Sequence, residues 1–168
     1  MKTMYQIEDN KNLYQGMGVL VYELNNLLIA VNLALYPHPK KITEQEQLEF
    51  LEMFARTNGQ FIKKQQKKIV EKLNQNIYDN LDDIICFRNK LCHSSLLTDS
   101  SHFPSLDKNK NYLIYIDKKS NEIKAEEVRV FEEEITKIRN KIATTFEEVQ
   151  KILINSNKGV KKRGVNFK

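Results

Sequence analysis

Three long segments of the chain repeat apolar residues every three or four positions, and this spacing is the strongest constraint on its fold. The segments span residues 8–36, about 61–88 and about 128–154. Their apolar positions include Leu13, Met17, Leu20, Leu24, Leu27, Val31, Leu35, Phe61, Ile69, Leu73, Ile77, Leu81, Phe131, Ile135, Ile138, Ile142, Phe146, Val149 and Leu153. Such spacing places each set on one face of an α-helix. Because each helix must bury that face against another element, the segments predict an antiparallel helical bundle.

A shorter helix is expected between the first two segments. Pro37 and Pro39 end the first helix, because proline supplies no amide hydrogen to the helical ladder. Thr43 and Glu46 have the spacing of a capping box, which marks the start of the next helix. Asn58-Gly59 is a helix stop signal. The apolar positions of this short helix are Leu48, Leu51 and Phe54.

A small β-hairpin is expected between the second and the third of the long helical segments. Residues 94–111 are polar and predict a loop, whereas residues 112–116 are rich in β-branched and aromatic side chains. Residues 117–121 have the composition of a turn, and residues 122–124 provide a second short strand. The predicted fold is therefore all-α, an antiparallel bundle of four to five helices with a β-hairpin insertion near residues 112–124.

The positive net charge comes from the carboxyl end of the chain. The net charge is +5, and five of the 27 basic residues lie in residues 158–168, which contain no acidic residue. The other basic residues equal the 22 acidic ones in number, so the body of the protein is neutral. We therefore expect one helical domain over residues 1–157 and a basic flexible tail over residues 158–168. A solvated tail is favoured over one that binds a polyanion.

The sequence favours a cytoplasmic protein without a membrane span, a metal or another cofactor. Residues 13–35 form the most apolar stretch, but one glutamate and three asparagines interrupt it. No secretion signal is visible at the amino terminus. Cys86 and Cys92 are the only two cysteines, too few for a four-ligand zinc site. Two free thiols are typical of a reducing compartment, and Cys92 is expected to be at least half-buried.

Arg88 and His93 combine a permanent cation with a side chain that exchanges protons near neutral pH. We expect them, with Asn89, to face a cleft. The neighbouring residues expected to face the core are Ile84, Ile85 and Leu91. An arginine binds phosphate oxygens through a fork of donors, and a neutral imidazole removes or donates a proton. This pair suits cleavage of RNA, whose 2′-hydroxyl supplies an internal nucleophile without a metal.

The segment Arg88-Asn89-Lys90-Leu91-Cys92-His93 resembles the R-x4-6-H signature of the HEPN superfamily. A polar residue directly after the arginine is common in that signature, and the plan of long helices is also similar. The resemblance implies an all-α, metal-independent endoribonuclease that serves as a toxin or in defence against phage. It implies that Arg88 and His93 are catalytic and that Asn89 helps to orient the site. It further implies a homodimer in which the two motifs face one another across a two-fold axis.

The partners implied by the resemblance are an RNA substrate, a second copy of the chain, and an antitoxin or defence protein. Ser95 departs from those family toxins that carry a partner-modified tyrosine at this position. Two other interpretations stay open: a catalytically silent HEPN module that binds nucleotide, RNA or protein, and a structural helical adaptor. In the plainest alternative, Arg88 pairs with Asp82 or Asp83 and His93 is a surface residue. The similar segment that begins at Arg139 lacks a histidine and is interpreted as a solvated helix face.

Overall fold

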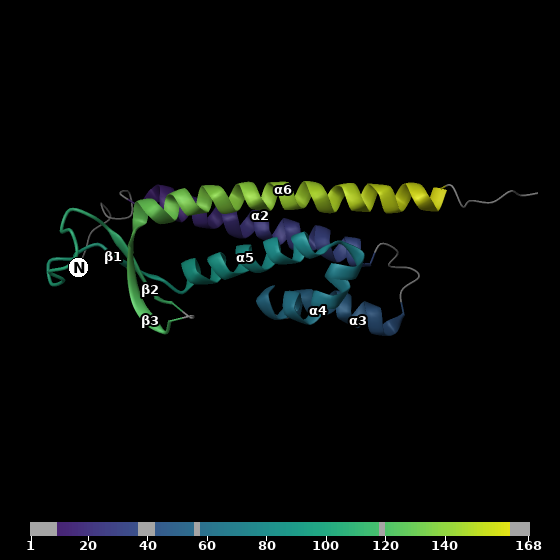
Figure 1. The fold of residues 1–168 in the computed structure, drawn as a ribbon, viewed down its shortest axis with the longest axis horizontal. Coiled ribbons are helices and arrows are strands. Elements are labelled where there is room, and N and C mark those ends of the chain that lie inside the picture. Colours follow the sequence, from purple (N-terminus) through teal and green to yellow (C-terminus); the bar gives the residue numbers. More distant parts are fainter. Residues whose placement is uncertain (1–9, 37–42, 56–57, 118–119, 162–168) are drawn as a thin grey trace, which may run out of the picture. The chain divides into compact units, whose positions relative to one another are not determined.

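The computed structural model describes residues 10–36, 43–55, 58–117 and 120–161. This part of the chain forms mainly helices, which agrees with the predicted fold class, and one small antiparallel sheet (Figure 1). The elements are α2 (Lys11–Leu35), α3 (Glu44–Ala55), α4 (Asn58–Lys72), α5 (Gln75–Cys92), β1 (Ser95–Leu97), β2 (Tyr112–Asp117), β3 (Glu122–Glu127) and α6 (Val128–Lys161). The chain divides into two compact units, residues 1–23 with 86–140 and residues 24–85 with 141–168.

The segment predicted as one helix over residues 61–88 consists of two helices, α4 and α5. The prediction was wrong because Asn74 caps a new helix: its side-chain oxygen accepts the amide hydrogen of Ile77 at 2.8 Å. The Leu73 amide still completes the ladder of α4 by donating to the Ile69 carbonyl at 2.8 Å. Asn58, predicted as part of a helix stop, is the first residue of α4. The apolar period of three and four runs through the break and therefore conceals it.

The predicted capping box at the start of α3 is confirmed. The Thr43 hydroxyl accepts the Glu46 amide hydrogen at 3.2 Å, and the Glu46 carboxylate accepts the Thr43 amide hydrogen at 3.0 Å. These reciprocal bonds satisfy two amide groups that a helix start leaves without partners. The sequence therefore predicted this helix start down to its side-chain contacts.

The predicted apolar face of α3 is not buried. Leu48 is 61% exposed and Leu51 is 58% exposed, while the side chain of Phe54 lies outside the described residues. Phe50 makes the inward contact instead, with its ring 6.1 Å from that of Tyr36 in an edge-to-face arrangement. The helix is consequently held mainly by polar contacts along its other faces.

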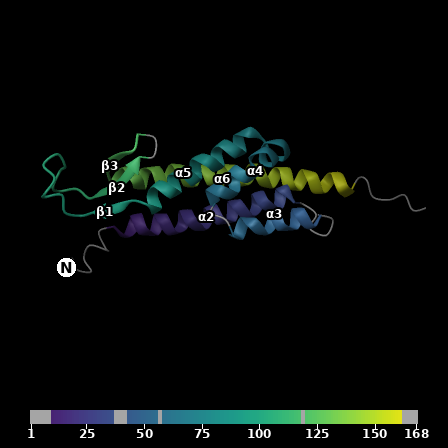
Figure 2. The same ribbon diagram turned by 90° about the horizontal axis from the view of Figure 1, so that it is seen from below.

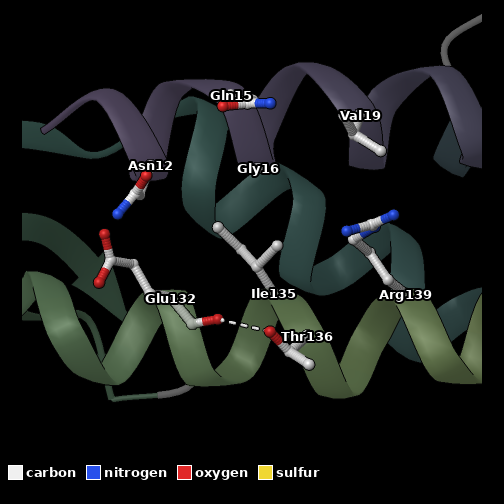
Figure 3. Close-up of a pocket in the computed structure, with 8 residues that line it drawn as sticks. All are labelled: Asn12, Gln15, Gly16, Val19, Glu132, Ile135, Thr136 and Arg139. Atoms are coloured by element: carbon white, nitrogen blue, oxygen red, sulfur yellow. Dashed lines mark hydrogen bonds between the residues drawn. The ribbon is translucent and has the colours of Figure 1, made fainter.

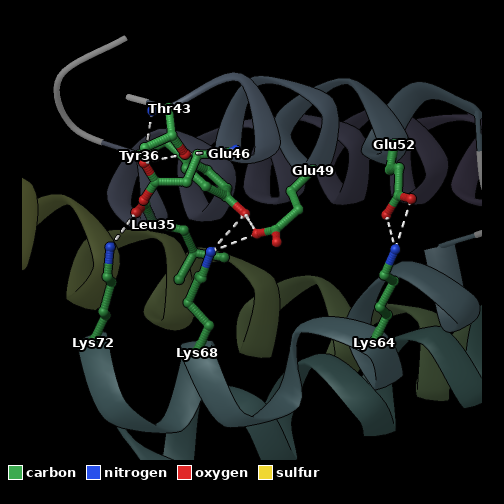
Figure 4. A network of polar contacts seen from close by, with 9 residues as sticks. All are labelled: Leu35, Tyr36, Thr43, Glu46, Glu49, Glu52, Lys64, Lys68 and Lys72. Carbon is green, nitrogen blue, oxygen red and sulfur yellow. Dashed lines mark hydrogen bonds and ion pairs between the residues drawn. The ribbon is translucent and has the colours of Figure 1, made fainter. Parts of the chain in front are cut away.

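Lysines of α4 hold α3 and the end of α2 within the unit formed by residues 24–85 and 141–168 (Figure 4). Lys64 binds Glu52 at 2.6 Å. Lys68 binds Glu49 at 2.6 Å and donates to the Tyr36 hydroxyl at 3.0 Å; that hydroxyl in turn donates to Glu49 at 2.7 Å. Lys64 and Lys68 are thus both engaged in ion pairs within the chain.

The acid dependence of stability tests this network. The hydrogen bonds from Lys68 and Tyr36 lower the pKa of Glu49 from 4.5 to about 2. A lowered carboxylate pKa stabilises the fold above the unfolded value, and the contribution disappears as the pH falls through the folded value. We expect the difference in Tm between wild type and Glu49→Gln to be largest near neutral pH and to close between pH 4.5 and about 2. Glu44→Gln, at an exposed position of α3, is the control, and a difference that does not change with pH would contradict the assignment.

The other unit contains a three-stranded antiparallel sheet in the order β1-β2-β3, where a two-stranded hairpin was predicted. The hairpin is confirmed, with Tyr112 opposite Glu127 and Asp117 opposite Glu122. The additional strand β1 falls in the predicted loop and pairs Ser95 with Ile114. It follows α5 almost directly, and β3 leads straight into α6 (Figures 1 and 2). The sheet is therefore joined in sequence to the helix end that carries Arg88 and His93.

Helix α2 is long and apolar enough, by length and composition, to cross a membrane, and no other helix in the described ranges is. This result differs from the expectation that its polar residues exclude such a span. Within the structure, 44% of its most apolar window is buried. One of the interrupting residues, Asn32, is buried and donates to the Phe50 carbonyl at 3.2 Å. Burial against protein is also what the core helix of a soluble bundle shows.

Helix α6 starts where predicted and extends beyond the expected end to Lys161. The buried positions of its predicted apolar face are Phe131, Ile135, Ile142 and Val149. The first part of the predicted basic tail thus continues the helix, and residues 162–168 lie outside the described residues.

Candidate functional site

The segment from Arg88 to His93 lies at the carboxyl end of α5, which ends at Cys92. As predicted, Ile84, Ile85 and Leu91 of this helix are buried, and Phe87 is buried as well. The Ser94 hydroxyl donates to the Leu91 carbonyl at 2.7 Å and satisfies one of the acceptors that a helix end leaves free. Packing and capping thereby fix the end of the helix in a defined position.

Arg88 and Asn89 contact each other. Nη1 of the Arg88 guanidinium donates to Oδ1 of Asn89 at 3.0 Å, so the amide oxygen orients the arginine. Nε of Arg88 is buried and has no hydrogen-bond partner among the residues that the structure describes. A buried donor without an acceptor costs free energy, more when it is charged. An acceptor from outside the described part of the chain would remove this cost.

His93 is the first residue after α5, and its side chain is exposed. Its amide still donates to the Asn89 carbonyl at 3.1 Å, so the backbone completes the last helical turn before leaving the helix. Within the described residues, no hydrogen bond joins Arg88 and His93. The structure therefore brings Arg88 and Asn89 together, and it leaves the imidazole accessible without coupling it to the arginine of the same chain.

The alternative in which Arg88 pairs with Asp82 or Asp83 is not observed. Asp83 binds Lys141 at 2.8 Å, and Arg88 takes part in no ion pair among the described residues. Arg139, in the similar segment of α6, forms two bonds to the Glu23 carboxylate at 2.9 and 2.8 Å. Its charge is thus compensated within the fold, and this supports a structural interpretation of the second segment.

Lys90 is a residue of the site segment to which the sequence analysis assigned no role. Its ammonium group binds Glu126 of β3 at 2.8 Å and Glu134 of α6 at 3.4 Å. It also lies over the rings of Tyr115 and Phe131, 4.6 and 4.5 Å from their centroids. The signal in the sequence was weak, because both carboxylates are more than thirty positions away.

A groove of about 370 Å³ lies between α2 and α6 in the same unit, and Figure 3 shows its lining. The lining residues are Asn12, Gln15, Gly16, Val19, Glu132, Ile135, Thr136 and Arg139. Gly16 of α2 is one of the lining residues, and a Cβ added there would lie 3.3 Å from Cγ2 of Ile135. None of the predicted site residues lines this groove, so it is separate from the site segment.

Within the described ranges, no three His, Cys, Asp or Glu side chains gather in a way that would hold a metal ion. Cys92 is exposed, contrary to the expectation that it is at least half-buried. It is the last residue of α5.

Comparison with known proteins gives no assignment: no family model, curated protein or solved structure matches the chain. The residues at the end of α5 are therefore the basis on which a function can be inferred.

Proposed function

We propose that the protein is a metal-independent, HEPN-type endoribonuclease in the cytoplasm that acts as a toxin or phage-defence effector. In this proposal the 2′-hydroxyl of RNA attacks the adjacent phosphorus and the bond to the 5′-oxygen breaks. The products carry a 2′,3′-cyclic phosphate and a 5′-hydroxyl. His93 takes the proton from the 2′-hydroxyl or gives one to the leaving oxygen, while Arg88 stabilises the charge on the phosphorane.

The buried, unpartnered Nε of Arg88 carries the proposal. Among the described side-chain nitrogen and oxygen atoms, Asn32 Oδ1 is the only other buried one without a partner. A phosphate oxygen is a strong acceptor for a guanidinium donor and would remove the cost of burying it. Because Asn89 already binds Nη1, the proposal assigns Asn89 the role of orienting Arg88.

The absence of a hydrogen bond between Arg88 and His93 among the described residues supports a site shared by two copies of the chain. One arginine and one exposed histidine, without a hydrogen bond between them, make a sparse site within a single copy. A two-fold axis near the end of α5 would place the arginine of one copy beside the histidine of the other, and the axis would repeat this pairing in a second, equivalent site. The proposal therefore includes a homodimer as the active form.

The direct test is incubation of the purified protein with RNA in the presence of EDTA. We expect cleavage that leaves 2′,3′-cyclic phosphate ends, identified by mass spectrometry of the fragments. Arg139→Ala is the matched control, because it removes an arginine from the similar segment of α6 and should leave cleavage intact. RNA binding without cleavage would favour the silent module, and neither binding nor cleavage would favour a structural adaptor.

A further inference from the structure

We propose that Lys90 is a positioning residue that connects the end of α5 to β3 and α6 and thereby sets the direction of Arg88 and His93. This inference rests on the proposed function for its catalytic meaning, but the connection itself is a property of the fold. It also gives the hairpin a role, because β3 holds the segment from Arg88 to His93 in place through Lys90.

The connection joins three elements of one compact unit. From α5, the Lys90 ammonium reaches Glu126 on β3 at 2.8 Å and Glu134 on α6 at 3.4 Å. Between a quarter and a third of each of these three side chains is exposed. Partly buried ion pairs with hydrogen bonds are screened less by solvent than exposed pairs, so this contact is a defined one.

Aromatic rings enclose the same ammonium group. Lys90 Nζ lies 4.6 Å from the ring centroid of Tyr115 and 4.5 Å from that of Phe131. The two rings meet edge to face at 5.9 Å, and the Tyr115 hydroxyl donates to Glu126 at 3.3 Å. Burial disfavours the charged amine, but the hydrogen bond to Glu126 and the charges of Glu134 and Glu126 outweigh it and raise the pKa of Lys90. Lys90 therefore stays charged within this enclosure.

This enclosure distinguishes Lys90 from Arg88. The Lys90 ammonium pairs with two carboxylates of the same chain, whereas Nε of Arg88 has no partner within the described ranges. A lysine inside a phosphate-binding motif suggests a contact with substrate, but its neighbours here make it a support for the helix. It belongs to the positioning machinery and contacts no substrate atom in this proposal.

Helix geometry explains how Lys90 affects its neighbours. Consecutive residues on a helix point about 100° apart. Leu91 is buried in the core, with 2% of its surface exposed, and Lys90 is fixed about 100° away from it around the axis. Two fixed points on one turn prevent that turn from rotating. Because this turn cannot rotate, it sets the directions of the Arg88 and Asn89 side chains and of the backbone that leads to His93.

The test compares Lys90→Met with Lys124→Met, using NMR and RNA cleavage. Lys124 lies on β3 and pairs with Asp117 in the same hairpin, so its replacement removes an equal charge without touching α5. We expect Lys90→Met to shift the resonances of the Arg88 Nε–H group and the His93 imidazole, while Lys124→Met leaves both in place. We also expect kcat to fall by about 10- to 100-fold with KM changed less than about twofold, as for misplaced catalytic groups.

Conservative and double variants separate positioning from loss of stability. Lys90→Arg keeps the positive charge between the carboxylates and the rings. It should therefore keep the resonances of Arg88 and His93, and kcat, close to the wild-type values. Glu126→Gln combined with Lys90→Met should shift the resonances no further than Lys90→Met alone, because both act through one contact. Circular dichroism spectra and melting curves would check that each variant is folded.

The outcomes distinguish this inference from the proposed function. Unchanged Arg88 and His93 resonances in folded Lys90→Met overturn the positioning role, whatever the protein does to RNA. Shifted resonances with no cleavage by wild type support the connection and reject the ribonuclease. A loss of kcat in Lys124→Met equal to that in Lys90→Met also overturns the inference, because the effect would then belong to hairpin charge in general.

Discussion

Replacing Arg88 with alanine is expected to lower kcat for RNA cleavage by about 100- to 1,000-fold, the usual cost of losing one donor to a developing oxyanion. His93→Ala removes the proton-transfer group and is expected to cost about 100- to 10,000-fold. Both side chains sit at the end of α5, one half-buried and one exposed, with the helix anchored by Leu91. The folded state should therefore survive either change, as melting curves would show.

Mixing the two inactive variants tests whether the site is shared between copies. In a dimer of Arg88→Ala with His93→Ala, one site would combine the intact arginine of one copy with the intact histidine of the other. Random exchange of subunits makes half of the dimers mixed, so we expect about one quarter of the wild-type rate to return. The measurement needs subunit exchange before the assay, confirmed by native mass spectrometry of differently tagged copies. A mixture no more active than its components would mean that each copy carries a complete site.

Among the variants proposed here, Phe131→Ala should lower the free energy of unfolding the most. Phe131 is fully buried and lies 6.3 Å from the ring of Phe87 and 5.9 Å from that of Tyr115. Its removal loses burial and leaves a cavity beside α5, which typically costs about 3–5 kcal/mol for a buried phenylalanine. Phe103→Ala is the control, because Phe103 is 49% exposed and should change the free energy of unfolding by less than about 1 kcal/mol. Chemical denaturation of the two variants makes the comparison, and equal losses would contradict the packing described for Phe131.

The helices were predictable because their pattern is local. The residues Leu20, Leu24, Leu27 and Val31 mark one face by spacing alone, and all are buried. The capping pair at the start of α3 was equally visible in the sequence. The break at Asn74 was missed because the apolar period continues across it, and a capping asparagine resembles an ordinary polar position.

The third strand was missed for a different reason. Ser95–Leu97 is only three residues long and becomes a strand by pairing with residues far along the chain, beginning at Tyr112. A three-residue segment has no periodicity of its own, so its structure depends on its partner. The exposure of Leu48 and Leu51 could not be predicted either, because spacing identifies an apolar face without saying what covers it.

The contrast between local patterns and contacts that join distant parts of the chain also applies to the site. Arg88 and Asn89 are adjacent in sequence, so their contact follows from local geometry. The contacts of Lys90 depend on β3 and α6, whose positions follow only from the folded chain. The sequence could therefore identify the candidate chemical groups. The structure was needed to show that Nε of Arg88 lacks an acceptor among the described residues, whereas Lys90 is paired with two carboxylates.

The composition of β3 also limits how copies of this chain can associate. It is the last strand of the sheet, and charged side chains occupy four of its six positions, Glu122, Lys124, Glu126 and Glu127. Three of these charges are negative, so pairing this edge with its counterpart in another copy would bring carboxylates together. The edge thus resists strand-by-strand growth into aggregates. Association through helical surfaces remains compatible with this protection, since it leaves the sheet edge in solvent.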